Sequence, residues 1–158
     1  MNTRYAPTTR GIQLYNGDFR CLHCRQLISA APRFSRVLNR NHCPYCLWSR
    51  HVDLTQAGDR LSACKAQMEP IGLTLKLTPR RYSPADGGEL MLIHRCVECG
   101  KLSINRIAAD DFADTLFEVY EDSWKMAPFI RRQLAAGGIL ALRAAELPIV
   151  KARLFGKN

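Results

Sequence analysis

Cysteines constrain the fold of this sequence most, because six of the seven occur in Cys-x-x-Cys pairs: Cys21 with Cys24, Cys43 with Cys46, and Cys96 with Cys99. Two such pairs provide four thiolates at the spacing with which facing turns bind a tetrahedral zinc ion. The first two pairs are therefore predicted to bind one zinc ion. The protein would fill all four coordination positions, which is typical of a structural rather than a catalytic site.

A second zinc site is predicted from the cysteines that remain, which are Cys64, Cys96 and Cys99. Three thiolates need one more ligand to complete a tetrahedron, and a histidine is the expected one. His51 is preferred because it lies outside the pairs, on a segment that is free to fold over the site. His94 is the alternative, although its position just before a turn cysteine is expected to aim it past the ion. Both predicted ions are structural.

The two other histidines are expected to have supporting roles. His42 adjoins a cysteine of the first site, where a neighbouring group commonly forms a hydrogen bond that orients the ligands. His23 lies inside the first turn and is expected to face solvent. If no histidine completed the second site, water would take the fourth position and a hydrolytic role would reopen.

The length and charge of the chain narrow its class. It has 158 residues and a formal net charge of +9, which suits one domain with an appendage or two small domains. The segment Met1–Pro7 has no apolar core, so no signal peptide is expected. Seven cysteines in a chain that is not exported favour metal ligation over disulfides. We therefore predict a cytoplasmic protein whose charge favours phosphate-rich or acidic-lipid partners.

Three segments are predicted: a basic N-terminal arm (residues 1–17), a zinc-binding domain (18–112) and a helical C-terminal extension (113–158). Residues 73–78 alternate apolar and polar side chains as a half-buried strand does, and residues 89–96 form a second predicted strand. Gly100 is expected to supply the positive φ that closes the third cysteine turn. The predicted fold class is α+β, a small zinc-ribbon-like β domain built on Cys-x-x-Cys turns, followed by helices.

The helices are predicted to follow residue 110. Asp110 or Asp111 is expected to cap the first, and Pro128 suits the first turn of another. The apolar run 134–150 contains Arg143 and Glu146 and is interrupted by two glycines and a proline. No membrane span is therefore predicted, and packing of these helices on the domain or on each other is favoured.

Five short segments together resemble the RNHCP domain family, which takes its name from the first of them. They are RNHCP (40–44), LWSRHVD (47–53), MEPIG (68–72), HRCVECG (94–100) and NRIAADD (105–111). The resemblance covers roughly residues 18–112 and leaves out the tail that follows. It implies a small prokaryotic domain that ligates metal, and it implies no activity.

Nucleic acid is the leading predicted partner, and structured RNA such as the ribosome is the preferred form of it. Residues 1–112 contain 16 lysines and arginines against 9 aspartates and glutamates. Arginine forks suit phosphate and aromatic rings stack on unpaired bases. The predicted phosphate contacts are Arg33, Arg36, Arg40, Arg50, Arg80, Arg81, Arg95 and Arg106, and the predicted stacking residues are Tyr45, Trp48 and Tyr82. The alternative roles are bracing of the zinc turns for Arg40 and a place in the core for Trp48.

Two other classes of function are alternatives to nucleic-acid binding. In a protein-interaction adaptor, the apolar tail would dock on a partner, and these tail and domain-end residues would be exposed: Phe112, Leu116, Phe129, Ile130, Leu134 and Leu140. In a redox sensor, oxidation of the thiolates would release zinc. An enzyme is not predicted, because the sequence has no Gly-rich phosphate loop and no His-Glu-x-x-His helix.

Overall fold

The computed structural model describes residues 18–56, 59–77 and 88–156, which divide into two compact units. The first unit contains the described residues up to Glu69 together with Cys96–Gly100 and Ala108–Phe112. The second contains those of Pro70–Arg95, Lys101–Ile107 and the chain from Ala113 on. The predicted arm, residues 1–17, lies outside the described residues. The two units are groups of residues that pack together, and each contains several separate stretches of the chain. They do not test the predicted domain boundary at residue 113, which stays a prediction.

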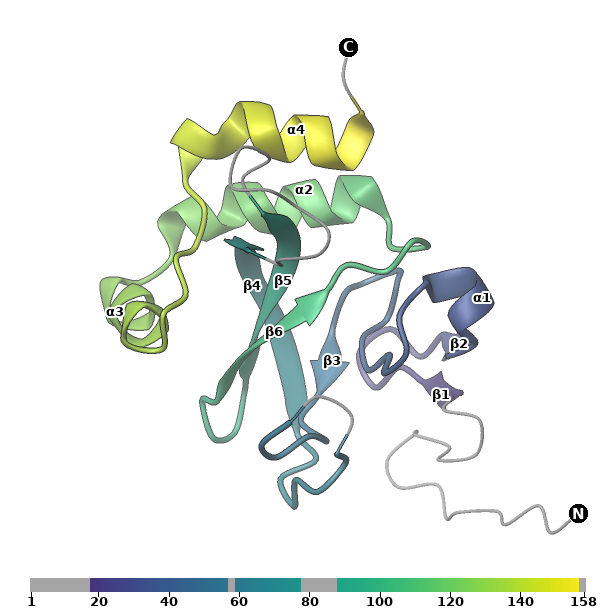
Figure 1. Ribbon diagram of the computed structural model, residues 1–158. Coiled ribbons are helices and arrows are strands. Elements are labelled where there is room, and N and C mark those ends of the chain that lie inside the picture. The colour runs from purple at the N-terminus through teal and green to yellow at the C-terminus, as the bar shows by residue number, and fades with distance from the viewer. Residues whose placement is uncertain (1–17, 57–58, 78–87, 157–158) are drawn as a thin grey trace, which may run out of the picture. The chain divides into compact units, whose positions relative to one another are not determined.

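The first unit is built from short elements around sulfur. Strands β1 (Phe19–Arg20) and β2 (Leu27–Ile28) pair antiparallel, with Phe19 opposite Ile28 (Figure 1). Helix α1 (Pro32–Ser35) begins with a proline, whose fixed φ suits a first helical turn, and it ends after one turn. Strand β3 (Ser49–Arg50) pairs with the start of β4 (Gln67–Lys76). The buried residues Phe19, Cys21, Ile28 and Cys43 form one core cluster of this unit, and Ala66, Met68 and Cys96 form another.

Longer strands form the sheet of the second unit. Strand β5 (Glu89–Cys96) pairs antiparallel with β6 (Leu102–Arg106), from Met91 opposite Arg106 to Arg95 opposite Leu102. The hydrogen-bonded strand order is β3-β4-β5-β6, in which β3 pairs with the part of β4 that belongs to the first unit. Residues 90–94 of β5 are all buried, as expected of a strand covered on both faces. Both predicted strands are therefore present, although β4 runs from Gln67 to Lys76 where 73–78 was expected, and residue 78 lies outside the described residues.

The helices after residue 112 belong to the second unit. They are α2 (Ala113–Asp122), the 3₁₀ turn η2 (Ser123–Lys125), α3 (Pro128–Ala136), the 3₁₀ turn η3 (Ala144–Glu146) and α4 (Leu147–Phe155). Helices α2 and α4 lie side by side (Figure 1), and the rings of Phe117 and Phe155 are 5.8 Å apart. Helix α3 begins at Pro128, as predicted. The fold class is therefore α+β with C-terminal helices.

The C-terminal extension packs directly on β4. The amide of Leu142 donates to the carbonyl of Leu73 at 2.9 Å, and the hydroxyl of Thr74 donates to the carbonyl of Leu140 at 2.8 Å. A Cβ at Gly72 would lie 3.1 Å from the side chain of Ser123, so this glycine permits the close approach. The extension thus completes the second unit.

The six apolar residues expected at a docking surface differ in exposure, and one of them, Ile130, is half-buried. Leu116 and Leu134 are fully buried, whereas Phe112, Phe129 and Leu140 are exposed. A partner that docks through the helices stays a prediction, with fewer exposed residues than expected to support it. None of the helices within the described residues is both long enough and apolar enough to cross a membrane.

Candidate metal centres

The structure brings the first four cysteines together. We call this group the first cluster; its ligand atoms all lie within 4.8 Å of one another, and its members are Cys21, Cys24, Cys43 and Cys46. The sulfur of Cys21 is 3.5 Å from that of Cys46, and the sulfur of Cys24 is 3.5 Å from that of Cys43. A Zn–S bond of about 2.3 Å would place the sulfurs of a regular tetrahedron ~3.8 Å apart. The cluster therefore fits a tetrahedral ion closely.

Each Cys-x-x-Cys turn is closed in the same way. The amide of the residue after the second cysteine donates to the carbonyl of the first cysteine, at 2.8–3.0 Å in the three turns. That residue is Arg25, Leu47 or Gly100, and each has a positive φ, of 68°, 66° and 74° respectively. The expectation for Gly100 is confirmed. The other two turns place an ordinary side chain in the left-handed region, so residue type alone did not reveal the shared geometry.

The second group contains one histidine and three cysteines. We call it the second cluster; its ligand atoms lie within 4.8 Å of one another, and its members are His51, Cys64, Cys96 and Cys99. Nδ1 of His51 is 3.4 Å from the sulfur of Cys99, and the sulfurs of Cys64 and Cys96 are 3.6 Å apart. These separations again suit a tetrahedral ion with nitrogen and sulfur ligands. The structure thus brings together the ligands that the sequence predicted for this site.

Hydrogen bonds around His51 position the second cluster. The amide of His51 donates to the carbonyl of Ala66 at 2.8 Å, and the amide of Lys65 donates back to the carbonyl of His51 at 3.1 Å. This pairing fixes His51 beside the segment that carries Cys64. The amide of Val97 donates to the carbonyl of Gln67 at 3.0 Å, which ties the third cysteine turn to β4. The ligands therefore come from three separate segments joined by backbone hydrogen bonds.

The thiols of the first cluster cannot all ionise without a cation. Hydrogen bonds from Cys43 and Cys46 hold the pKa of Cys21 well below its usual range. The bond to Cys21 raises the pKa of Cys43 to about 12, and bonds to Cys21 and Cys43 raise the pKa of Cys46 above its usual range. One thiolate is thus stabilised by its protonated neighbours. A divalent cation would reverse this pattern, because a coordinated thiol loses its proton.

A buried ion-pair network, which we call the clamp, supports the first cluster. The guanidinium of Arg40 donates to Asp110 at 2.7 Å and to Asp111 at 3.2 Å, and Nε2 of His42 is 2.7 Å from Oδ2 of Asp111. The side chains of Arg40 and Asp111 are 0% exposed. Asp111 also accepts the amide of Ala108 at 2.8 Å. The clamp therefore fastens residues 108–111 to the segment that leads into Cys43.

Two expectations from the sequence concern residues of the clamp. His42 was expected to form a hydrogen bond beside the first cluster, and Asp111 is its partner. The expectation that Asp110 or Asp111 caps a helix gives way to a different role: α2 begins at Ala113, and both carboxylates bind Arg40. Sequence reasoning missed the clamp itself. The signal that could have found it is the segment 105–111, which ends in two acids although one acid is enough to cap a helix.

His94, the alternative ligand, lies elsewhere. It is fully buried in β5, and its Nδ1 is 2.8 Å from the side-chain nitrogen of Asn105 on β6. Asn105 donates to His94, and its nitrogen also lies 3.5 Å from the hydroxyl of Ser103. His94 thus takes part in a polar contact between two strands of the second unit and is not among the grouped ligands.

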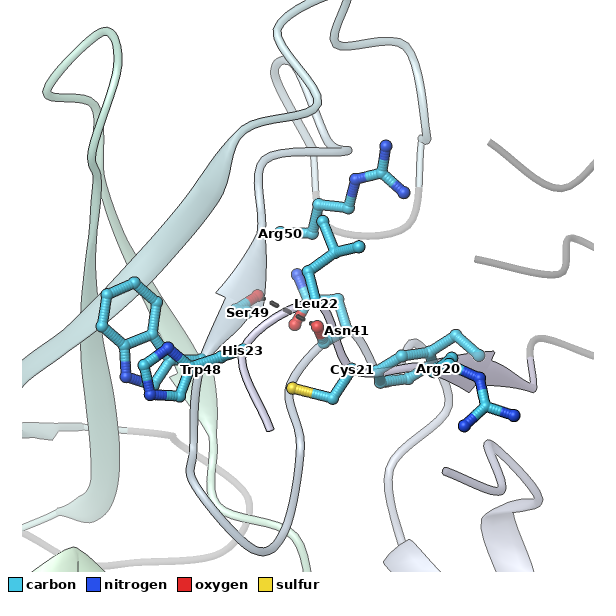
Figure 2. Close-up of a pocket in the computed structure, with 9 residues that line it drawn as sticks. Arg20, Cys21, Leu22, His23, Asn41, Trp48, Ser49 and Arg50 are labelled. Atoms are coloured by element: carbon cyan, nitrogen blue, oxygen red, sulfur yellow. Dashed lines mark hydrogen bonds between the residues drawn. The ribbon is translucent and has the colours of Figure 1, made fainter. Parts of the chain in front are cut away.

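His23 and Trp48 form a stacked pair beside the first cluster. Their ring centroids are 4.2 Å apart with an interplanar angle of 4° (Figure 2). Figure 2 also shows Ser49, whose hydroxyl donates to the carbonyl of Asn41 at 3.1 Å in the small pocket that these residues help to line. His23 is exposed, as expected. One face of the Trp48 indole is covered by the imidazole, so that face is not available to a stacking base.

Two of the arginines predicted to contact phosphate are buried. Arg40 is 2% exposed and held in the clamp, and Arg50 is 4% exposed with its Nε donating to the carbonyl of Lys65 at 2.8 Å. These two are corrected from phosphate contacts to structural residues, because a buried and bonded guanidinium does not reach a phosphate on the surface. The alternative role that was kept for Arg40, bracing the zinc turns, agrees with the clamp.

The other predicted contacts are distributed over both units. In the first unit, Arg33 and Arg36 are exposed, as is Tyr45. In the second unit, Arg95 lies 5.9 Å from the ring centroid of Phe129, and Nε of Arg106 donates to Glu89 at 2.8 Å. Three more lie outside the described residues, namely Arg80, Arg81 and Tyr82.

Two groups of four ligands, six of the eight on Cys-x-x-Cys turns, define a candidate metal-binding module. A model of the RNHCP domain family matches residues 16–117. The match covers more than half of the chain, and the chain therefore belongs to the RNHCP domain family. Residues from 118 on lie outside it. The comparison with curated proteins found no match, and neither did the comparison with solved structures.

Proposed function

We propose that the two clusters each bind one zinc ion and that both ions are structural. The observation that carries this proposal is the convergence of four ligands in each cluster, within 4.8 Å. Four thiolates, or three thiolates with one imidazole, are the ligand sets that zinc prefers in structural sites. Because the chain fills every position, no open position is left for substrate. Elemental analysis and native mass spectrometry of the purified protein should find two zinc ions per chain.

The zinc-stabilised first unit binds nucleic acid, with structured RNA such as the ribosome as the leading partner. The main support is local charge: residues 19–52 contain no aspartate or glutamate. Four of the arginines in this stretch are exposed, namely Arg20, Arg25, Arg33 and Arg36. When arginines bind the phosphates of a nucleic acid, they release the counterions held there, so this surface favours a polyanion.

Three carboxylates that flank this arginine-rich stretch in the sequence or in space are already engaged. Within the described part of the first unit, the clamp binds Asp110 and Asp111, and Asp18 accepts the amide of Ala30 at 3.0 Å. The ion pairs described there involve Arg40 and Arg60, and none involves Arg33 or Arg36. These exposed arginines therefore suit an external anion. Thiols that ligate zinc also suit a reducing compartment, and we place the protein in the cytoplasm.

Binding can be tested by fluorescence anisotropy with a labelled RNA hairpin at increasing salt. We expect affinity to fall steeply with salt, and the double variant Arg33→Ala/Arg36→Ala to weaken binding and reduce the salt slope by about 2. The matched control is Lys125→Ala/Arg132→Ala, which removes two exposed cations from the second unit. If the zinc-loaded protein bound no RNA or DNA at low salt, nucleic-acid binding would be rejected.

A second candidate function, redox-controlled release of zinc, is favoured by one observation. Cys99 of the second cluster is exposed, whereas every cysteine of the first cluster is buried or half-buried. Hydrogen peroxide would oxidise Cys99 to a sulfenic acid, and a neighbouring thiol of the cluster would displace water to form a disulfide. Two thiols thereby lose two electrons, and peroxide is reduced to water. Stoichiometric peroxide should release one zinc ion per chain, reversibly with dithiothreitol; release of both ions together would contradict this selectivity.

A further inference from the structure

We propose that an exposed aromatic surface of the first unit, made of Phe34, Tyr45 and Phe112, stacks the unpaired bases of single-stranded nucleic acid. This inference rests on the proposed nucleic-acid-binding function and specifies its ligand. The three side chains are 51%, 45% and 51% exposed. Large aromatic residues are more often buried, and a group of them in contact with solvent marks an interaction surface.

Backbone hydrogen bonds connect the segments that carry the three residues. The amide of Ala109 donates to the carbonyl of Ser35, next to Phe34, at 2.7 Å. The amide of Phe112 donates to the carbonyl of Pro44, next to Tyr45, at 3.1 Å. The rings of Tyr45 and Phe112 meet edge to face, with centroids 5.2 Å apart. The segment 108–112 therefore connects α1 to the second cysteine turn and carries one of the rings itself.

The surface is also held rigidly. Tyr45 belongs to the second cysteine turn, where its amide donates to the sulfur of Cys43 at 3.4 Å. Phe112 directly follows Asp111, whose carboxylate is fixed by Arg40 and His42 in the clamp. Rings that are fixed before binding lose little entropy when a base stacks on them. The clamp thus has a consequence beyond stability, because it sets where Phe112 is presented.

Charge selects a nucleic acid as the occupant. The guanidinium of Arg33 lies 4.7 Å from the ring centroid of Phe34, and Arg36 is exposed at the end of the same helix. The one carboxylate of the clamp that reaches solvent, Asp110, is 35% exposed and paired with Arg40 at 2.7 Å. Aromatic faces flanked by arginines match bases flanked by phosphates. A purely apolar partner would leave the arginines without a role.

Stacking also predicts a preference for single strands. In a duplex the faces of the bases are covered by their neighbours, whereas a single strand can place them on protein rings. Loss of one stacked base costs a single-strand binder about 5- to 150-fold in affinity, the equivalent of ~1–3 kcal/mol. The same loss should hardly change binding to a duplex, which contacts only the arginines.

The test is fluorescence anisotropy of the full zinc-loaded chain with a labelled 12-nucleotide RNA, the DNA of the same sequence, and the corresponding duplexes. We expect tighter binding to the single strands. We also expect Phe34→Ala, Tyr45→Ala and Phe112→Ala each to weaken single-strand binding by at least about 5-fold. Tyr45→Phe should bind like the unmodified protein, because it keeps the ring. Phe129→Ala, which removes an exposed ring of the second unit, is the matched control. Zinc content of two ions per chain verifies that each variant is folded.

Three results would overturn the inference. If single strands and duplexes bound equally and the alanine variants behaved like the unmodified protein, stacking would be wrong while the proposed function stood. If no nucleic acid bound, both would be rejected. If the surface bound polyglutamate and not nucleic acid, and lost that binding in Arg33→Ala, the partner would be an acidic peptide and the inference would again be wrong. Stronger binding to RNA than to DNA, or the reverse, would support the inference and identify the preferred strand.

Discussion

The two clusters differ in how the chain builds them. The first takes all its ligands from two turns, and it lies in the core of its unit beside Phe19 and Ile28. The second takes one histidine and three cysteines from three segments, and one of its cysteines, Cys99, is exposed. A buried all-sulfur site exchanges its ion with difficulty, whereas an exposed ligand gives chelators and oxidants access. The first ion is therefore enclosed by the short elements around it, whereas the second, beside the buried residues Ala66, Met68 and Cys96, ties strand ends together.

This difference indicates which part of the fold each ion stabilises. Around the first cluster the strands have two residues each, so few backbone hydrogen bonds remain if the ion leaves. Around the second cluster β4 and β5 continue well beyond the ligands, and β5 pairs with β6 over five residue pairs. We therefore expect loss of the first ion to unfold its surroundings and loss of the second to loosen strand ends only.

The largest effect is expected from Cys43→Ser. Cys43 is fully buried and contributes both a ligand and a core side chain. Structural zinc contributes roughly 10–16 kcal/mol of apparent binding free energy in small zinc-dependent folds, so its loss should unfold the segment around β1, β2 and α1. Native mass spectrometry should find one zinc per chain or none, and hydrogen exchange should find residues 19–48 unprotected. Two ions and an unchanged melting temperature would contradict the comparison.

Cys99→Ser tests the other half of the comparison. The variant should lose the second ion and keep the first, because the two clusters share no ligand. We expect one zinc per chain, retained protection of residues 19–48, and a smaller fall in the melting temperature than in Cys43→Ser. Native mass spectrometry and thermal unfolding measure both quantities. If Cys99→Ser unfolded the first unit as completely as Cys43→Ser, the two ions would have equal structural weight.

Asp111→Ala should have the next largest effect. It leaves the buried guanidinium of Arg40 and the imidazole of His42 without their shared carboxylate, and breaking a buried pair costs about 3–5 kcal/mol. The comparator is Asp110→Ala, whose carboxylate binds the same arginine but is 35% exposed, and which should cost less. Urea unfolding of the zinc-loaded variants measures the free energies. Equal costs for the two variants would show that burial of Asp111 adds nothing.

The sequence predicted the ligands better than their supports. Cysteine spacing depends on local chemistry, so Cys21 to Cys46 could be assigned from the sequence, and the strand 89–96 was visible from its apolar run. His51 was preferred over His94 because it lies outside the pairs, and strand pairing gives the physical reason: it brings Asn105 to His94 and Ala66 to His51.

The supports could not be predicted because their partners are distant in sequence. Arg40 and Asp111 are separated by 71 positions, and no local pattern reports that separation. The same holds for the packing of Ser123 on Gly72, which makes the C-terminal extension part of the second unit. Arg40 and Arg50 were assigned to a surface because arginine usually lies there, and tertiary ion pairing and backbone bonding overrode that preference.

The smallest effect is expected from Asp59→Asn, which acts on the loop between His51 and Cys64. The carboxylate of Asp59 accepts the amides of Leu54, Thr55, Gln56 and Leu61 at 2.8–3.0 Å. These bonds, that of Gln56 first, hold the pKa of Asp59 well below its usual range. A lowered pKa means that the contribution to stability is complete above the unfolded pKa of about 3.9 and is lost only as the pH falls through the folded value. At neutral pH these hydrogen bonds therefore make their full contribution to stability, and a substitution of Asp59 removes part of it.

Asparagine would turn an amide donor toward two of these backbone donors and loosen the loop. The second cluster should then release its ion faster to a chelator, by up to about tenfold, as loss of a group that orients metal ligands does elsewhere. The first cluster should release its ion at the unmodified rate, so a two-phase release curve should change in its fast phase alone. Glu69→Gln, an exposed carboxylate outside the loop, is the control. A change of the slow phase would mean that the two clusters are coupled, and the contrast between a core ion and a strand-end ion would have to be given up.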